Sequence, residues 1–149
     1  MIDRFAGNYY FLSNFYPCTI ALDNHLYPSA EHAFQASKTN SEIERLLIAS
    51  ASSPSAAKEY GRNCTLRPDW EFKKDIIMLK IERIKFKDPI LQKKLLDTGE
   101  EELQEGNLWH DNYWGSCSCY KCRNKNGLNT LGQILMQVRQ EYKEKIYYF

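Results

Sequence analysis

Three residues whose side chains suit acid–base or binding chemistry recur at helical spacing in the segment 27–38. Glu31, Gln35 and Lys38 stand at positions i, i+4 and i+7, so a helix would project all three from one face. Such a helix is expected to begin at residue 28 or 29, with the hydroxyl of Ser29 as its N-cap. An acid, an amide and an amine on one face are typical of a polar small-molecule site. The alternative is a surface helix with Glu31 in its first turn, where the helix dipole favours a carboxylate.

Further segments that mix polar and aromatic residues lie at 11–17, 61–70, 111–115 and 127–132. Each also has a simpler structural explanation. Asn14 can hold a turn through its own backbone hydrogen bonds. Asp69 can be a helix cap and Trp70 a core residue, and the glycines at 127 and 132 can allow close approach of the last helix.

The sequence pattern around these segments predicts a mostly helical α+β fold with a small antiparallel sheet near the N-terminus. Residues 9–27 are β-like and turn-rich, with strands expected at 9–11 and 18–22, a turn at 23–24 and a return strand at 25–27. Helices are expected at about 28–38, 41–49, 54–61, 68–86, 89–96 and 128–142, and an ordered loop at 106–126. The expected buried face of the helix at 68–86 consists of Ile76, Ile77, Met78, Ile81, Ile84 and Phe86.

The bulk composition bounds the function. A length of 149 residues suits one domain, residues 1–149, and 43% apolar with 13% aromatic residues argues for packed clefts rather than disorder. A formal net charge of +1 gives no global attraction to nucleic acid or to an anionic membrane, although a local basic patch remains compatible with a nucleic-acid substrate. No segment has the length of a signal-peptide core or a membrane span. Five cysteines without an export signal indicate reduced thiols, so a cytoplasmic location is expected.

Eight islands together resemble one known family, the YbiA-like NADAR family, in the family's order from about residue 5 to residue 139. They are Asn14-Phe-Tyr-Pro17, Tyr27-Pro-Ser-x-Glu-His-x-x-Gln-Ala-x-Lys38, Gly61-Arg62, Arg67-x-Asp-Trp70, Lys85-Phe86, Leu96-x-Thr-Gly99, Trp114-Gly115 and Asn129-x-Leu-Gly-x-x-Leu-Met136. Arg139 fits the arginine that closes the family pattern. Any one island would be weak, but eight over nearly the whole chain make the resemblance specific.

The resemblance implies a compact, largely helical domain that acts on ribose attached through a nitrogen. Known activities of the family are cleavage of N-glycosidic bonds in early riboflavin-pathway intermediates and removal of ADP-ribose from guanine bases in DNA. No cofactor is implied. We therefore interpret the chain as an N-glycosidase. The alternative is a non-catalytic module that binds ADP-ribose or a related nucleotide.

Cleavage of a C1′–N bond needs a carboxylate beside the anomeric carbon and a proton donor near the leaving nitrogen. Glu31 is the first candidate for the carboxylate, and Asp111 is the second. Lys38 has two roles open to it. It could donate a proton or bind phosphate, or its amine could attack the aldehyde of the opened sugar and form a Schiff base, which requires a depressed pKa.

Binding roles follow from side-chain type within the matching motifs. Trp70 and Trp114 would offer stacking faces to a base. Arg62 and Arg67 suit phosphate, with ordinary surface ion pairs as the alternative. Asn14, Gln35 and Asn129 could bind ribose hydroxyls, and His32 is expected to be a hydrogen-bonded core residue that orients Glu31. The substrate-binding set is completed by Phe15, Tyr27, Asp69 and Gly115.

A cysteine-rich stretch near residues 110–122 is a candidate metal site. Cys117, Cys119 and Cys122, with His110 upstream, could supply three thiolates and an imidazole to zinc. The spacing is not the usual pair of Cys-x-x-Cys knuckles, and the family chemistry needs no metal. We therefore expect no metal and free thiols in a loop, with structural zinc as the alternative.

The expected partner is a nucleotide-like small molecule or an ADP-ribosylated DNA base, and no membrane. A modified DNA base would pair the protein with an ADP-ribosyltransferase toxin. The exposed charges of Lys121, Arg123 and Lys125 could contact phosphate or could simply be solvated. The sequence leaves the substrate, the oligomeric state and the metabolic or toxin-reversal context open.

Overall fold

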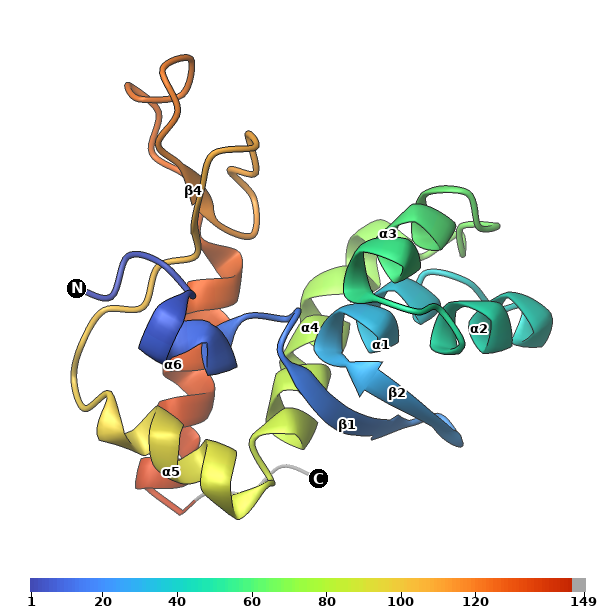
Figure 1. The fold of residues 1–149 in the computed structure, drawn as a ribbon, viewed down its shortest axis with the longest axis horizontal. Helices are drawn as coiled ribbons and strands as arrows, with labels where there is room; N and C mark the ends of the chain where they lie inside the picture. The colour runs from blue at the N-terminus through green and yellow to red at the C-terminus, as the bar shows by residue number, and fades with distance from the viewer. Residues whose placement is uncertain (146–149) are drawn as a thin grey trace. The chain divides into compact units, whose positions relative to one another are not determined.

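The structure is a computed structural model that describes residues 1–145, and it is a mostly helical α+β fold (Figure 1). In chain order the elements are η1 (Gly7–Leu12), β1 (Pro17–Leu22), β2 (His25–Ser29), α1 (Ala30–Ala36), α2 (Glu42–Ala49), α3 (Pro54–Arg62), α4 (Trp70–Lys85), α5 (Pro89–Asp97), β3 (Gly106–Asn107), β4 (Ser116–Cys117) and α6 (Thr130–Lys143). The expected small antiparallel sheet near the N-terminus is confirmed. No helix within residues 1–145 is long and apolar enough to span a bilayer.

The chain divides into two compact units. One comprises Asn14–Lys85, and the other comprises Met1–Ser13 with the described residues from Phe86 onward. The expectation of a single domain over 1–149 stays a prediction.

The first unit opens with the β1–β2 hairpin. Asp23 and Asn24 form its turn with φ of 51° and 66°, a pair of left-handed residues that suits the twist of a hairpin. Ile20 pairs with Tyr27, and both side chains are buried. The turn and the return strand therefore match the sequence prediction, and β2 runs on to Ser29.

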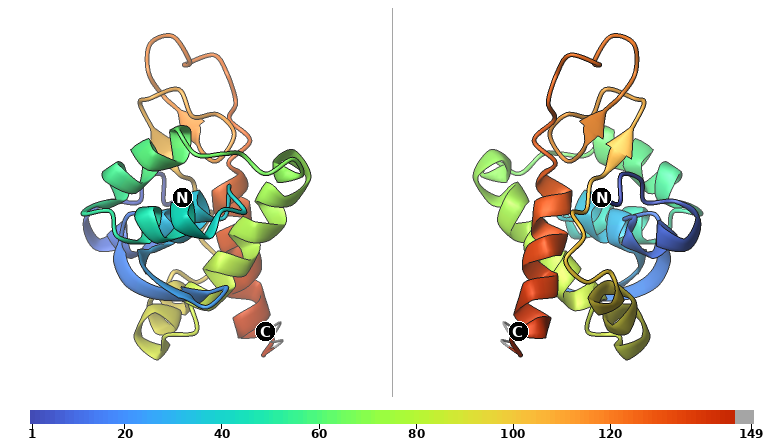
Figure 2. Two further views of the ribbon diagram at one scale, coloured as in Figure 1. Left: turned by 90° about the vertical axis from the view of Figure 1, so that its right-hand side faces the viewer. Right: turned by 90° about the vertical axis from the view of Figure 1, so that its left-hand side faces the viewer.

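Helix α1 lies at the centre of this unit, in contact with α2, α3, α4 and both strands (Figures 1 and 2). Its predicted N-cap is confirmed, because the Ser29 hydroxyl accepts a hydrogen bond from the backbone N–H of His32 at 3.1 Å. The predicted start at residue 28 or 29 is slightly too early, since the helix begins at Ala30 and β2 extends to Ser29. All seven residues of α1 are buried. Because α1 is buried on every side, its polar residues are not the solvated face of a surface helix, and they are therefore candidates for a functional site.

The second unit contains the 3-10 helix η1 at a place where the sequence predicts a strand. The sequence predicts a strand at residues 9–11, but these residues belong to the 3-10 helix η1. Its buried residues, Phe11 and Leu12, are adjacent rather than alternating, and the Tyr9 N–H donates to the Ala6 carbonyl at 3.0 Å. A short i→i+3 turn therefore replaces the strand. Helices α5 and α6 pack together, and α5 also contacts η1.

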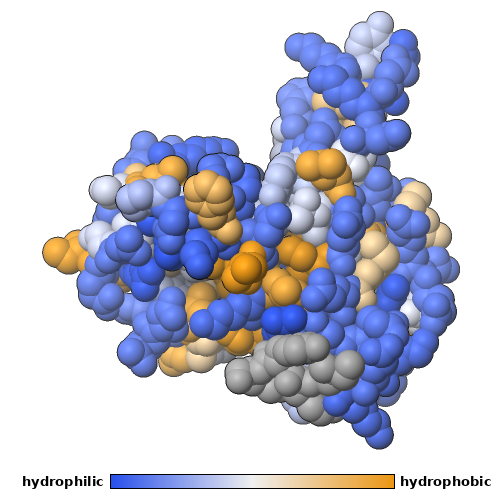
Figure 3. All heavy atoms as spheres, turned by 180° about the vertical axis from the view of Figure 1, so that it is seen from behind, coloured by the Kyte–Doolittle hydropathy of each residue, from blue (hydrophilic) through white to orange (hydrophobic). Residues whose placement is uncertain are grey.

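The segment between α5 and α6 is held by backbone pairing rather than by helices. Ile2 forms a parallel bridge with Leu103, and the two-residue strands β3 and β4 pair in parallel, side by side in Figure 2. The loops around β4 present a mainly hydrophilic surface (Figure 3). Their large apolar residues Trp109 and Tyr120 are 61% and 79% exposed, so these loops have little apolar core of their own.

Candidate active site

Glu31 lies in the first turn of α1, and its side chain is buried. Gln35, one turn on, donates from Nε2 to Glu31 Oε1 at 3.2 Å. The Glu31 backbone N–H donates to the Asn14 carbonyl at 3.0 Å, which fixes residue 14 against the start of the helix. The predicted proximity of Glu31 and Gln35 is therefore present, and Asn14 joins them.

Polar oxygens without partners gather in this same unit. Within residues 1–145, the buried side-chain oxygens that lack a hydrogen-bond partner are Asn14 Oδ1, Gln35 Oε1 and both carboxyl oxygens of Glu82. The Asn14 side chain reaches α4, because its Nδ2 lies 3.4 Å from the sulfur of Met78. Buried oxygens are normally satisfied, and unsatisfied ones call for an explanation such as a catalytic role or a bound group.

Two charged residues of α4 belong to the candidate site: Glu82, which sequence reasoning missed, and Lys85, which it named only within the Lys85-Phe86 island and gave no role. Glu82 and Lys85 are 0% and 2% exposed. With Met78 they form an i, i+4, i+7 stripe on the buried face of the helix. The expected apolar face was wrong at Ile76, which is 63% exposed. The sequence does carry a signal for this, because Glu82 and Lys85 fall at helical spacing on the same face as Met78 and Ile81.

Burial and neighbouring charge set the electrostatics of this cluster. Burial raises the pKa of Glu82 to about 7, with the negative charge of Glu31 adding to the rise and the positive charge of Lys85 opposing it. Burial lowers the pKa of Lys85 below its usual value, and the charge of Glu82 opposes that change. Near neutral pH Glu82 can therefore hold or release a proton.

Lys38 lies just beyond α1, which corrects the prediction that it belongs to the helix. The Ser37 hydroxyl donates to the Ala33 carbonyl at 2.7 Å, and the Lys38 N–H turns to the Gln35 carbonyl at 3.1 Å in a final 3-10 turn. Burial lowers the pKa of the Lys38 amine, while the charge of Glu31 opposes that change. The negative charge of Glu31 therefore acts on the Lys38 amine. The pKa of this amine is nevertheless lowered, which is the change that a nucleophilic amine requires.

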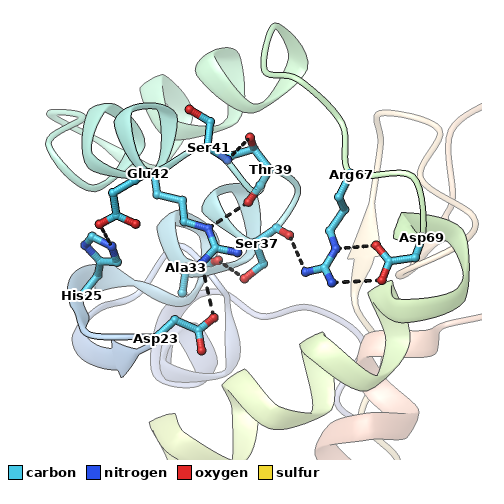
Figure 4. Close-up of polar contacts among 10 residues, drawn as sticks. Asp23, His25, Ala33, Ser37, Thr39, Ser41, Glu42, Arg67 and Asp69 are labelled. Atoms are coloured by element: carbon cyan, nitrogen blue, oxygen red, sulfur yellow. Dashed lines mark hydrogen bonds and ion pairs between the residues drawn. The ribbon is translucent and has the colours of Figure 1, made fainter.

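Arg67 and Asp69 form a two-point ion pair that braces the chain next to Lys38 (Figure 4). Arg67 Nε and Nη2 donate to the Asp69 carboxylate at 2.6 and 3.0 Å, and the Arg67 backbone N–H donates to the Lys38 carbonyl at 2.7 Å. The pair holds the pKa of Asp69 below its usual value. In this structure Arg67 is therefore engaged by protein groups, as the ion-pair alternative states.

His32 is a core histidine, as expected. Its Nε2 lies 3.0 Å from the Ala51 carbonyl, and its Nδ1 lies 2.7 Å from the Ser29 hydroxyl. A carbonyl only accepts, so Nε2 carries the hydrogen and Nδ1 accepts from Ser29. Both ring nitrogens are thus used by protein groups, and we leave His32 out of the substrate-contacting set.

The other predicted residues of this unit lie in the core or near the surface, and their binding roles stay predictions. Tyr27 is buried in β2, and burial raises its pKa to about 12. Trp70 is buried and packs on the Phe34 ring at 5.0 Å, which fits the core alternative. Arg62 is exposed in an i, i+3 ion pair with Glu59, and Phe15 is half-buried.

Gly61 shapes the site through its missing side chain. A Cβ at this position would lie 1.9 Å from Gln35 Oε1 and 2.8 Å from Gln35 Cδ. No side chain fits there unless Gln35 moves. The glycine of the Gly-Arg motif therefore leaves room for the Gln35 amide that holds Glu31.

Asp111, Trp114, Gly115 and Asn129 belong to the second unit. Asp111 Oδ1 accepts from the backbone N–H groups of Tyr113 and Trp114 at 3.1 and 2.9 Å, so the carboxylate shapes its own turn. Trp114 is half-buried against the Tyr113 ring. The catalytic role of Asp111 and the stacking role of Trp114 stay predictions.

Both ends of the Asn129 amide bond to backbone groups. Its Nδ2 donates to the Leu103 carbonyl at 2.8 Å, and its Oδ1 accepts from the Glu105 N–H at 3.0 Å. Gly115 permits close packing there, because a Cβ would lie 2.1 Å from the Glu105 carbonyl oxygen. These two residues hold the chain between α5 and α6 in place.

Similarity to known proteins extends over nearly the whole chain. Residues 3–143 match the model of the NADAR domain. The N-glycosidase YbiA of Shigella flexneri is 37% identical over 139 residues, which cover 91% of this chain and 83% of the relative. A riboflavin biosynthesis protein of Vibrio vulnificus is 35% identical over 140 residues, covering 92% of this chain and 36% of that protein. The NMR structure of the E. coli protein YbiA superposes with a TM-score of 0.78 at 33% identity, covering 100% of this chain and 91% of the other. The chain therefore belongs to the NADAR domain family.

Proposed function

We propose that this protein hydrolyses the N-glycosidic bond between ribose and a base, with the Glu31 cluster at the reacting sugar. One observation carries the proposal. The buried Glu31 carboxylate stands with Gln35, Asn14 and Glu82 in a unit whose unpartnered buried oxygens come from three of these four residues. Such oxygens can accept hydrogen bonds from ribose hydroxyls.

Family membership supplies the enzyme class. The curated relatives of closely matching length are named N-glycosidases, at about the same identity over most of the chain. The relatives thus support a hydrolase that acts on N-glycosyl bonds. The substrate and the roles of individual residues are our proposals.

In the proposed reaction the C1′–N bond breaks with its electron pair going to the base nitrogen, and C1′ gains positive charge. The Glu31 carboxylate stabilises that charge. Water adds its oxygen to C1′ and gives up a proton, and the leaving nitrogen takes up a proton. Glu82, whose pKa is about 7, is the group we assign to hold a proton beside Glu31.

Lys38 is assigned to the same sugar, with two chemical routes. As a cation it would bind phosphate or protonate the leaving group. As an amine it would add to C1′ of the ring-opened sugar, where C1′ is an imine of the base nitrogen. The C1′–N bond to the base would then break with the base leaving as its amine, which gives a Schiff base between Lys38 and C1′ that water hydrolyses. Its lowered pKa supports the second route, and borohydride reduction separates the two because only the Schiff base yields a stable adduct.

For the substrate we propose a phosphoribosyl-amino-pyrimidine of the riboflavin pathway. The Vibrio vulnificus and maize relatives named as riboflavin biosynthesis proteins support this choice. ADP-ribosylated guanine in DNA offers the same ribose–nitrogen bond and is tested in parallel.

The test is a mass-spectrometric turnover assay of the purified protein on both substrates. We expect release of ribose 5-phosphate from the pyrimidine, with at least a 100-fold loss of rate in Glu31→Gln and in Lys38→Ala. Matched controls are Glu59→Gln and Lys93→Ala, which alter exposed ion-paired groups and should leave the rate unchanged.

Binding of ADP-ribose without turnover of either substrate would overturn the proposal in favour of a binding module. Release of free ADP-ribose from DNA alone would keep the reaction and replace the substrate. Full activity in Glu31→Gln would remove our assignment of the carboxylate.

A further inference from the structure

The loops around β4 bring a histidine and three cysteines together. His110 follows β3, Cys117 is in β4, and Cys119 and Cys122 lie in the turn beyond it. Their ligand atoms all lie within 4.8 Å of one another. The remaining cysteines, Cys18 and Cys64, belong to the other unit.

The distances match those of a tetrahedral metal site. His110 Nδ1 lies 3.3 Å from the sulfur of Cys119, 3.4 Å from that of Cys122 and 3.9 Å from that of Cys117. Zinc–sulfur bonds of about 2.3 Å and a zinc–nitrogen bond of about 2.0 Å at the tetrahedral angle separate nitrogen and sulfur by about 3.5 Å. The three observed distances fall on both sides of that value.

Ordinary hydrogen bonding explains this arrangement poorly. A ring nitrogen can donate one hydrogen or accept one, yet Nδ1 of His110 faces three sulfurs at once. The His110 backbone also lies in the left-handed region with φ of 70°, which few residues other than glycine adopt. A shared central cation would satisfy all four atoms together.

We propose that His110, Cys117, Cys119 and Cys122 bind one Zn²⁺ ion as a structural site. Three thiolates and an imidazole are soft ligands that favour zinc over magnesium or calcium. Four protein ligands fill a tetrahedral shell, which leaves no open position for substrate or water. The zinc alternative of the sequence analysis thus replaces the expectation of free thiols.

Neighbouring groups are placed as outer partners of the sulfurs. Asn112 Nδ2 lies 3.5 Å from the Cys122 sulfur, and the Cys119 N–H lies 3.4 Å from the Cys117 sulfur. N–H groups directed at thiolates stabilise their charge and orient them. Asn112 also accepts from the Cys117 N–H at 2.9 Å, which ties the 111–115 turn to the ligand strand.

The ion would replace the apolar core that these loops lack. His110 and Cys117 flank the turn 111–115, so binding both to one ion closes the loop that carries the predicted Asp111 and Trp114. Metal clips of this kind stabilise small segments that cannot bury enough apolar surface.

The test is metal analysis of the full chain, purified without chelator and with any affinity tag removed. We expect about one zinc per chain by inductively coupled plasma mass spectrometry. Cys119→Ser should lose most of it, whereas Cys119→His, which restores a ligand, should retain it. Cys18→Ser and Cys64→Ser are matched controls outside the cluster and should keep full zinc content.

A second measurement uses the unaltered chain. Replacement of the metal by Co²⁺ should give the visible absorption of a tetrahedral thiolate site. A zinc content near zero in the unaltered chain, a disulfide among the three cysteines in the chain as isolated, or equal zinc in Cys119→Ser would overturn the proposal. None of these readouts depends on enzymatic activity, so they separate it from the proposed function.

Discussion

At the scale of single residues, Glu82 shows how burial converts an ordinary side chain into a functional candidate. A carboxyl with no exposed surface loses the hydration of its charge, so the folded protein favours the protonated form and the pKa rises to about 7. The unfolded chain keeps the usual value of 4.5. Between these two values Glu82 binds more protons in the folded state than in the unfolded state, and its contribution to the free energy of unfolding therefore falls as pH rises.

Replacement of Glu82 by Gln should remove this pH dependence. The free energy of unfolding of Glu82→Gln relative to the unaltered protein should rise between pH 4.5 and 8 by up to about 3 kcal/mol, because a pKa difference of one between the folded and unfolded chain corresponds to about 1.4 kcal/mol. Urea denaturation across that range measures the difference. Glu71→Gln, which alters an exposed carboxylate of the same helix, should follow the unaltered protein at every pH. Parallel curves for Glu82→Gln and the unaltered protein would contradict the buried, protonatable carboxyl.

The residues that sequence reasoning identifies and those it misses differ in one physical respect. Glu31 and Gln35 belong to a motif whose local helical spacing places them on one face. Glu82 lies about fifty residues further along, and only the packing of α4 against α1 brings its helix to theirs. Arg67 and Asn129 are predicted as ligand groups because their chemistry allows it. Side-chain type alone does not reveal that protein groups already occupy their donors.

At the scale of elements, the start of α1 depends on one serine that does two things. Ser29 caps the helix through the His32 N–H and donates from its hydroxyl to His32 Nδ1. Both partners are buried, so neither finds water when the hydroxyl is removed. Ser53 caps α3 through the Ala56 N–H at 3.0 Å and is half-buried.

Ser29→Ala should therefore cost more than Ser53→Ala. Loss of a cap costs about 1 kcal/mol, and an unsatisfied buried ring nitrogen adds about 1–3 kcal/mol. We expect a loss of about 2–4 kcal/mol for Ser29→Ala and about 1 kcal/mol for Ser53→Ala. The urea midpoints, with unchanged slopes, measure both. Equal losses would show that the Ser29–His32 bond contributes nothing.

Most elements can be predicted from sequence because their signals are local. Serine or proline marks the start of α1, α2 and α3, and the turn at 23–24 follows from residue type. The predicted end of α1 is wrong, because the Ser37 hydroxyl bonds back to the helix and ends it before Lys38. The strand prediction at 9–11 is wrong because it depends on three consecutive aromatic residues, a composition that favours strands. In the structure these residues belong to a 3-10 helix, and the buried residues are the adjacent Phe11 and Leu12 rather than alternate positions.

At the scale of the whole molecule, charge limits how the protein can meet a polyanionic substrate. Twenty basic and nineteen acidic residues leave a formal charge of +1, so long-range attraction to DNA is weak. The basic residues Lys121, Arg123 and Lys125 lie exposed in the loop beyond β4, and the Arg123 guanidinium stacks on the Tyr120 ring at 4.5 Å. Any phosphate contacts they make would be few.

Salt dependence of turnover measures that limit directly. Each phosphate contact to a single strand contributes a slope of about −0.7 in a log–log plot against salt. With one or two contacts, activity on DNA that carries ADP-ribosylated guanine should fall by less than about sevenfold between 50 and 200 mM salt. Activity on the phosphoribosyl pyrimidine should change less over the same range. A variant with Lys121, Arg123 and Lys125 changed to Gln should flatten only the DNA curve. A fall well beyond tenfold, unchanged in that variant, would mean that DNA binds a basic surface other than this loop, and would favour DNA as the natural substrate.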